Sequence, residues 1–135
     1  MRPVLYKDYI TREDLQTTLS CIFVFGDNDQ RSGFGGQAKQ MRGEPNAAGI
    51  RVKKVPAMDK SSFYRDDEYP ENVRKINEDL DHLSEISENK IIVFPKSGIG
   101  TGLAQLNIKA PETFRYLTNE LNLRFGIVNV NKGGR

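Results

Sequence analysis

The apolar residues of this chain form two kinds of pattern: short continuous runs and longer stripes with helical spacing. Two runs stand out, CIFVF at residues 21–25 and IIVFP within residues 90–95. A strand that is buried on both faces of a sheet reads this way, because both alternating sets of side chains meet apolar neighbours. We therefore predict buried strands in these two places. Shorter extended segments are predicted at residues 3–6, around Ile50 and Val52, and at residues 125–130.

The stripes predict helices. The longest begins at Pro70, a residue tolerated at the first helical position, and consists of Val73, Ile76, Leu80, Leu83 and Ile86. A second stripe follows Pro111 and consists of Phe114, Leu117 and Leu121. Short helices are predicted at residues 11–19, where Thr11 is a suitable N-cap, and at residues 37–42. Four polar residues lie off the first stripe, so we expect them to face solvent: Glu78, Asp79, Asp81 and His82.

Strands that alternate with helices indicate an α/β fold with a mostly parallel sheet. No repeat, low-complexity tract or linker interrupts the pattern, so residues 1–135 are predicted to form a single domain. Residues 131–135 are predicted to be a frayed tail.

Two glycine-rich loops follow the two apolar strands. The first glycine-rich loop (residues 33–37) comes after Asp27 and Asn28 and contains Gly33, Gly35, Gly36 and Gln37. The second glycine-rich loop (residues 97–102) consists of Ser97, Gly98, Ile99, Gly100, Thr101 and Gly102. Glycine lets a ligand approach the backbone closely, and N–H groups at a helix start bind anions. Ligands of such sheets sit beyond the carboxyl ends of the strands, so we predict that both loops line one phosphate-binding cleft. A bulky side chain at Gly36 or Gly100 is then expected to block the ligand and leave the fold intact.

The composition of the chain limits which kinds of binding site it can contain. The chain has 135 residues and a net charge of +2, and this small charge does not require a nucleic-acid partner. Its one cysteine, Cys21, lies in an apolar run and excludes an intramolecular disulfide. One cysteine and one histidine give no metal cluster of familiar spacing, and residues 27–29 lack the spacing of a calcium loop, so neither a metal nor a cofactor is predicted. No apolar run approaches the ~18 residues of a membrane helix, and we expect a cytoplasmic protein without membrane contact.

The segment FPKSGIGTGLAQL at residues 94–106 resembles the P-x-I-G-x-G-L-x-x-L loop of macro domains, which are α/β modules that bind ADP-ribose. The resemblance is nearest to the branch of the terminal ADP-ribose protein glycohydrolase, where a tyrosine and an asparagine open the preceding helix, as Tyr69 and Asn72 do here. It implies a three-layer macro domain-like fold with a mixed, mostly parallel sheet. The segment GFGGQAKQMRG at residues 33–43 also resembles segments of phage proteins, which would imply a host cytoplasm.

The resemblance also implies site roles. The second glycine-rich loop would wrap the pyrophosphate and distal ribose, and the first would form the facing wall. Asn28 would touch the distal ribose, and Asp27 the ribose or adenine. The related glycohydrolases use a lysine at the end of a central strand, for which Lys53 and Lys54 are the candidates here. They also use an aspartate directly after G-x-G-L, where this chain has Ala104. Whether the chain hydrolyses an ADP-ribose linkage therefore stays open, with Asp27 and Asp29 as candidates for a substitute acid.

Other functions stay open beside ADP-ribose binding. A nucleic-acid or protein-interaction module could use the same loops and a modest basic face made of Lys39, Arg42, residues 51–54 and Lys96. This face lacks the interleaved aromatic residues of single-strand binders. Arg42 is equally well explained as the surface partner of Glu44. A nucleoside-phosphate hydrolase matches poorly, because no glutamate follows Thr101 closely. The expected partners are ADP-ribose or a related nucleotide, an ADP-ribosylated protein or a nucleic acid; the oligomeric state stays open.

Overall fold

The computed structural model describes residues 3–129. Its strands are β1 (Val4–Lys7), β2 (Cys21–Asn28), β3 (Ala47–Lys53) and β4 (Ile91–Pro95). Its α-helices are α1 (Arg12–Thr17), α2 (Ala38–Met41), α3 (Tyr69–Ile86), α4 (Leu106–Lys109) and α5 (Pro111–Phe125), and two short 3₁₀ turns are η1 (Lys60–Ser62) and η2 (Asp66–Glu68). The four strands form one sheet in the order β1-β4-β2-β3, and each pair of neighbours is parallel.

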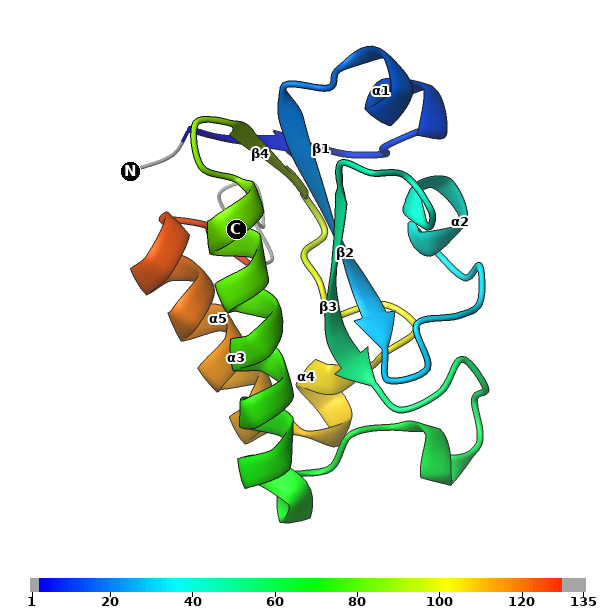
Figure 1. Cartoon of the computed structure of the whole chain (residues 1–135). Coiled ribbons are helices and arrows are strands. Elements are labelled where there is room, and N and C mark those ends of the chain that lie inside the picture. The colour runs from blue at the N-terminus through cyan, green and yellow to red at the C-terminus, as the bar shows by residue number, and fades with distance from the viewer. Residues whose placement is uncertain (1–2, 130–135) are drawn as a thin grey trace.

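Helices cover both faces of this sheet (Figure 1). Side chains of α3, α4 and α5 pack against one face, and those of α1 and α2 pack against the other. The contacts of strand β2 explain why its residues 21–25 are all apolar. Ile22 and Val24 belong to the cluster under α3 and α5, whereas Phe23 and Phe25 belong to the cluster under α1 and α2. The predicted α/β class and burial of this strand on both faces are confirmed.

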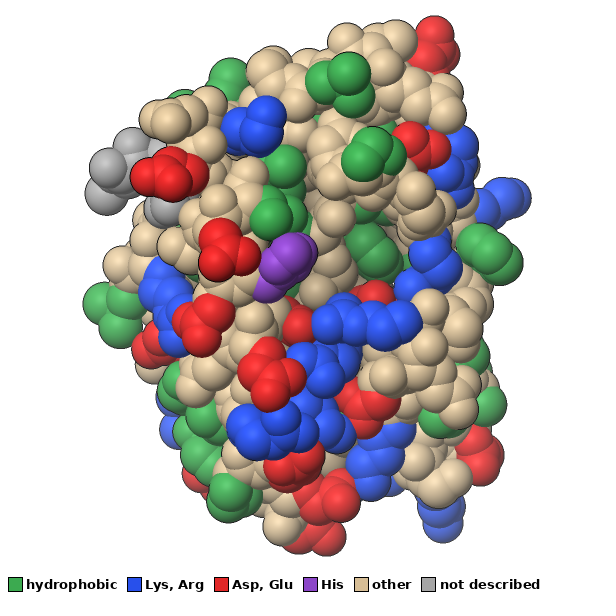
Figure 2. Space-filling model, viewed as in Figure 1, with side chains coloured by type: hydrophobic (Ala, Val, Ile, Leu, Met, Phe, Trp, Pro, Cys, Tyr) green, Lys and Arg blue, Asp and Glu red, His purple; other side chains and the backbone are tan. Residues whose placement is uncertain are grey.

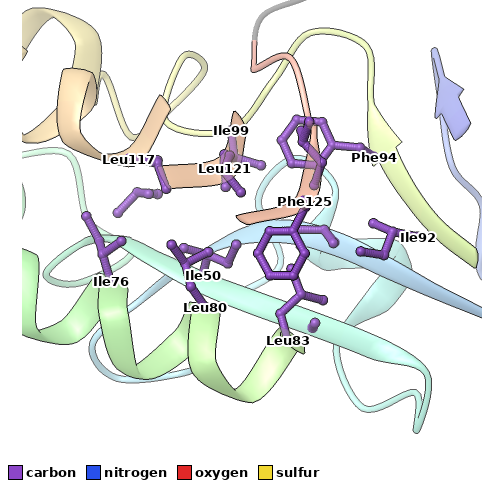
Figure 3. Close-up of a cluster of buried hydrophobic side chains, with 14 of the residues drawn as sticks. Ile50, Ile76, Leu80, Leu83, Ile92, Phe94, Ile99, Leu117, Leu121 and Phe125 are labelled. Carbon is purple, nitrogen blue, oxygen red and sulfur yellow. The ribbon is translucent and has the colours of Figure 1, made fainter. Parts of the chain in front are cut away.

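The larger cluster lies between the sheet and the two long helices. Figure 3 shows Ile76, Leu80 and Leu83 of α3 and Leu117 and Leu121 of α5 meeting the strand residues. All five of these side chains are fully buried, as the two helical stripes predicted. Ile99 of the second glycine-rich loop joins the same cluster (Figure 3). The second glycine-rich loop is therefore anchored directly in the core.

Two expectations are wrong, and one helix was not predicted. The sheet is not mixed, because its strand pairs are all parallel and the described antiparallel contact is an isolated bridge between Lys53 and Phe63. Asp79 does not face solvent; it is 6% exposed and accepts hydrogen bonds from Arg31 and Arg51. Helix α4 was not predicted from the sequence; Leu106, its first residue, buries its side chain in the core. His82 is exposed, as expected.

The predicted last strand, residues 125–130, is also wrong for its described part. Helix α5 continues to Phe125, whose side chain extends the buried stripe by one more step of four residues. Gly126 then ends the helix with a φ of 70°, and its N–H donates to the Asn122 carbonyl. This is the left-handed termination that glycine favours. Residues 126–129 form no strand, and residue 130 and the predicted tail lie outside the described residues.

Candidate functional site

A cavity of about 620 Å³ opens beyond the carboxyl ends of β2 and β4. Strand β2 leads to α2 on one face of the sheet, whereas β4 leads to α4 and α5 on the other face. A crevice forms where neighbouring parallel strands send their connections to opposite faces, and ligands bind in such crevices. Both glycine-rich loops line this cavity, as predicted. Further walls come from Asp8, Tyr9, Ser32, Arg42, Val52, Lys53, Pro56, Leu103 and Ala104.

The two glycine-rich loops also lie close to each other across the cavity. A methyl group built onto Gly35 would lie 2.9 Å from Cδ1 of Leu103. On the other side, a methyl group built onto Gly33 would lie 2.9 Å from Cβ of Pro56. The first glycine-rich loop therefore lies between Pro56 on one side and Leu103, which directly follows the second loop, on the other. Only glycine fits at residues 33 and 35 without overlap with these two side chains.

The backbone of the second glycine-rich loop is turned so that its carbonyls face the protein. The Gly100 carbonyl accepts from the Leu106 and Asn107 N–H groups, and Gly98 and Gly100 each have a φ of 82°. The Ile99 N–H donates to the buried Asn129 side chain over 2.9 Å. Among the described residues, the N–H groups of Gly100, Thr101 and Gly102 have no hydrogen-bond acceptor. These three donors remain available to a ligand in the cavity.

The first glycine-rich loop has the same property. The Gly35 and Gly36 carbonyls accept from Ala38 and Lys39 at the start of α2, over 3.2 and 3.3 Å. Within residues 3–129, the N–H groups of residues 33–37 donate to no acceptor. Successive free backbone N–H groups form the concave donor arrays that bind anions. The expected contribution of helix dipoles is not supported, because α2 and α4 contain four residues each.

Asp27 is committed to protein contacts on both carboxylate oxygens. Oδ1 accepts from Arg42 Nη2 at 2.7 Å and from the Asn28 N–H at 2.8 Å. Oδ2 lies 3.2 Å from Arg31 Nη1. The residue is 6% exposed. A general acid must instead reach a reacting group with one of its oxygens, so this arrangement favours a structural role for Asp27.

Two other predicted ligand contacts hold backbone as well. Asn28 accepts from the Gln30 N–H and donates to the Ser32 carbonyl, which closes a turn before the first glycine-rich loop. Gln37 pairs with both the N–H and the carbonyl of Ile10, at 2.9 and 2.8 Å. Both residues line the cavity, but their amide groups fix its walls.

The two candidate lysines differ in their position relative to the cavity. Lys53 lines the cavity and is 6% exposed; its ammonium donates to the carbonyls of Pro56 and Ala57. Burial lowers its pKa, since the desolvated site disfavours the charged form. Lys54 does not line the cavity and pairs with Glu68. Only Lys53 is therefore in a position to meet a ligand.

Sequence reasoning missed Asp8 and Tyr9 as cavity residues, and it gave Arg42 only a surface role. The first two follow β1, and the shared carboxyl edge of parallel strands was a usable sign that they belong to the site. Arg42 lies 15 positions from Asp27, a separation that no local pattern reveals. It does not pair with Glu44, which instead pairs with Arg12 at 2.5 Å.

Most cations of the proposed basic face are neutralised by neighbours. Arg42 pairs with Asp27, Arg51 with Asp79, Lys54 with Glu68 and Lys96 with Asp8, while Lys53 is buried. Figure 2 shows positive and negative side chains interleaved on one face of the molecule. Nucleic-acid binding depends on cations that can replace the counterions of phosphates, so this face gives it little support.

The fold and cavity define an α/β domain with an all-parallel sheet and a glycine-lined cleft at its carboxyl edge. Residues 5–120 match a family described as Family of unknown function (DUF7831), and the chain belongs to it. No curated protein and no solved structure matches the chain. Within residues 3–129, no cluster of three potential metal ligands occurs and no helix is long and apolar enough to cross a membrane.

Proposed function

We propose that this chain binds a nucleotide diphosphate of the ADP-ribose class in the glycine-lined cleft. The observation that carries the proposal is the set of free N–H groups that both glycine-rich loops present around one cavity. Backbone donors are suited to phosphate oxygens, because glycine allows close approach and the donors are already oriented. The cavity volume of about 620 Å³ falls within the range of about 300–1,000 Å³ that small-molecule sites occupy.

The ADP-ribose class is favoured over a bare anion for two reasons. The second glycine-rich loop resembles the phosphate loop of macro domains, and a macro domain-like arrangement is part of this proposal. In addition, the cationic side chains that line the cavity, Arg42 and Lys53, are engaged with protein acceptors. Recognition would therefore rely on backbone donors and on the shape of an extended ligand.

Binding without efficient hydrolysis follows from the same site. Ala104 lines the cavity at the position where the resembled glycohydrolases place their carboxylate. Asp27 offers no free oxygen as a substitute, because Arg31 and Arg42 hold both of its oxygens. Lys53 remains beside the cavity, but its ammonium is engaged with the carbonyls of Pro56 and Ala57, and Asp8, the other carboxylate in the cavity wall, pairs with Lys96. Neither group is placed as the proton carrier that the acid–base step needs. We propose recognition of ADP-ribose, free or attached to a protein or nucleic acid, with hydrolysis slow or absent.

Calorimetry and thermal shift with ADP-ribose, its 1″-phosphate, NAD and cyclic nucleotides test the proposal. A ligand at 100 times its Kd should stabilise the fold by about 2.7 kcal/mol. The matched variant is Gly102→Val. Gly102 lines the cavity, and a methyl group built there meets no atom within 4 Å, so the new side chain enters ligand space without a clash in the protein.

The expected result is an unchanged melting temperature of free Gly102→Val with affinity reduced by more than about tenfold, because the side chain obstructs the ligand. Full affinity in Gly102→Val would place the ligand elsewhere. If none of these nucleotides binds and an oligonucleotide binds with steep salt dependence, the interaction module replaces this proposal.

A further inference from the structure

The guanidinium of Arg42 lies under the first glycine-rich loop and connects it to the end of β2. An arginine in the wall of an anion cleft ordinarily serves as the counter-charge of the ligand. We infer that Arg42 has a different role: with Asp27 it forms a latch that fixes the backbone of residues 32–36 for ligand binding. The inference rests on the proposed function and makes Arg42 a positioning residue.

The contacts of Arg42 are directed at the protein. Nε donates to the Gly33 carbonyl at 2.8 Å, and Nη2 donates to the Ser32 carbonyl at 3.1 Å and to Asp27 Oδ1 at 2.7 Å. Nη1 reaches Asp27 Oδ2 at 3.4 Å. The side chain is 17% exposed, and its guanidinium carbon lies 5.6 Å from the centre of the Phe25 ring. Four of the five donor positions of a guanidinium are thus used inside the protein, which leaves little of it for a ligand.

The latch explains the orientation of the loop donors. Arg42 holds the carbonyls of residues 32 and 33 on the protein side, and Gly33 completes the turn with a φ of 93°. The N–H groups of Gly33, Gly35 and Gly36, which line the cavity, then remain without described acceptors. Ordering these donors before the ligand arrives removes part of the entropic cost of binding.

The latch is also anchored to the rigid part of the fold. Asp27 binds Arg31, and Arg31 reaches Asp79 of α3 at 2.6 Å. Asp79 in turn accepts from the Arg51 N–H of β3 at 2.7 Å. The position of the guanidinium is therefore set by a strand and by the longest helix.

The first arm of the test separates positioning from direct charge contact. Affinity for ADP-ribose is measured by calorimetry over a salt series in wild type, Arg42→Lys, Arg42→Gln and Asp27→Asn. A lysine keeps the charge but cannot reproduce the fork of donors. All three variants should bind about tenfold more weakly or worse, with the salt slope of the wild type. Rescue by Arg42→Lys together with a flatter salt dependence in Arg42→Gln would overturn the inference, because a counter-charge behaves in this way.

The second arm does not need a ligand. Backbone ¹⁵N order parameters of Gly33, Gly35 and Gly36 should fall in the Arg42 variants from about 0.85 toward 0.6 or lower, while those of Gly100 and Gly102 stay unchanged. Asp27→Asn keeps the shape of the side chain and supplies the same readout if an Arg42 variant does not fold. Arg74→Gln, which removes an exposed arginine paired with Glu71 and Glu78 on α3, is the control and should change neither readout.

The outcomes are distinct. Unchanged order in the first glycine-rich loop overturns the latch, and so does increased mobility with undiminished affinity. If wild type binds neither ADP-ribose nor the related probes, the proposed function fails, and the order parameters still decide whether Arg42 sets the loop.

Discussion

The two glycine-rich loops border the same cavity but are held by different forces. The second is fixed mainly by the burial of Ile99 in the core and by backbone hydrogen bonds at Pro95 and Gly100, with one side chain, that of Asn129, bound to the Ile99 backbone. The first is fixed mainly by side chains from elsewhere in the chain: Arg42 binds its carbonyl at residue 33, and Gln37 binds Ile10. The second loop is therefore packed into the hydrophobic core, whereas the first loop is held against the core by side-chain hydrogen bonds. Substitutions at the core-facing residues of the second loop should therefore lower stability, whereas substitutions in the first loop should mainly lower ligand affinity.

The sharpest contrast lies within the second glycine-rich loop, between Gly100 and Gly102. A methyl group built onto Gly100 would lie 3.2 Å from Cβ of Leu106, and the backbone there has a φ of 82°. Gly100→Val should therefore lower the free energy of unfolding by about 2–4 kcal/mol, through overpacking and a strained left-handed residue. The contact with Leu106 and the positive φ argue against the expectation that a bulky side chain at Gly100 leaves the fold intact.

Urea unfolding measures the effect. Gly102→Val, which enters open space, should change the free energy of unfolding by less than about 0.5 kcal/mol. Equal losses in the two variants would contradict the division between core-facing and ligand-facing glycines.

A smaller change in stability and affinity is expected when Gly36, in the first glycine-rich loop, is compared with Gly43, which lies in a turn outside the cavity. Gly36 and Gly43 have φ values of 58° and 94°, and a methyl group built onto either meets no atom within 4 Å. Gly36 lines the cavity and Gly43 does not. Each alanine variant should lose roughly 1 kcal/mol of stability, because both adopt left-handed backbone.

Only Gly36→Ala should also weaken ADP-ribose binding, since its methyl group occupies ligand space. Calorimetry on both variants gives the answer. A parallel loss of affinity in Gly43→Ala would mean that stability, not obstruction, controls binding.

The difference between the two loops also explains which features could be predicted from the sequence. The buried strands and the meeting of the two loops followed from apolar runs and from the shared edge of parallel strands. The latch did not, because Arg42 and Asp27 are joined by geometry that only the folded chain creates. The burial of Asp79 was missed because helical spacing shows which residues are apolar, not which charges meet arginines across a sheet. Residues 125–130 have strand-like composition, but Phe125 continues the stripe of α5 and Gly126 ends it.

Lys53 extends the side-chain support of the first glycine-rich loop. Its ammonium holds the carbonyls of Pro56 and Ala57, and Pro56 lies against Gly33. Burial lowers the pKa of Lys53 in the folded chain, while nearby Asp59 acts in the opposite direction. The unfolded chain keeps this proton up to the ordinary lysine pKa of about 10.4.

Between the lowered folded-state pKa and about 10.4, the unfolded state binds more protons than the folded state. The free energy of unfolding contributed by Lys53 should therefore rise with pH across this window and be constant below it. Lys53→Met removes this titration. The free energy of unfolding of wild type relative to this variant should therefore increase as the pH approaches about 10.4, the ordinary lysine pKa. We expect this to be the smallest of the effects predicted here. Parallel urea unfolding of both proteins from neutral to alkaline pH isolates the effect, because all other titrating groups are shared. A pH-independent difference would contradict this prediction, because it would mean that the pKa of Lys53 is the same in the folded and the unfolded chain.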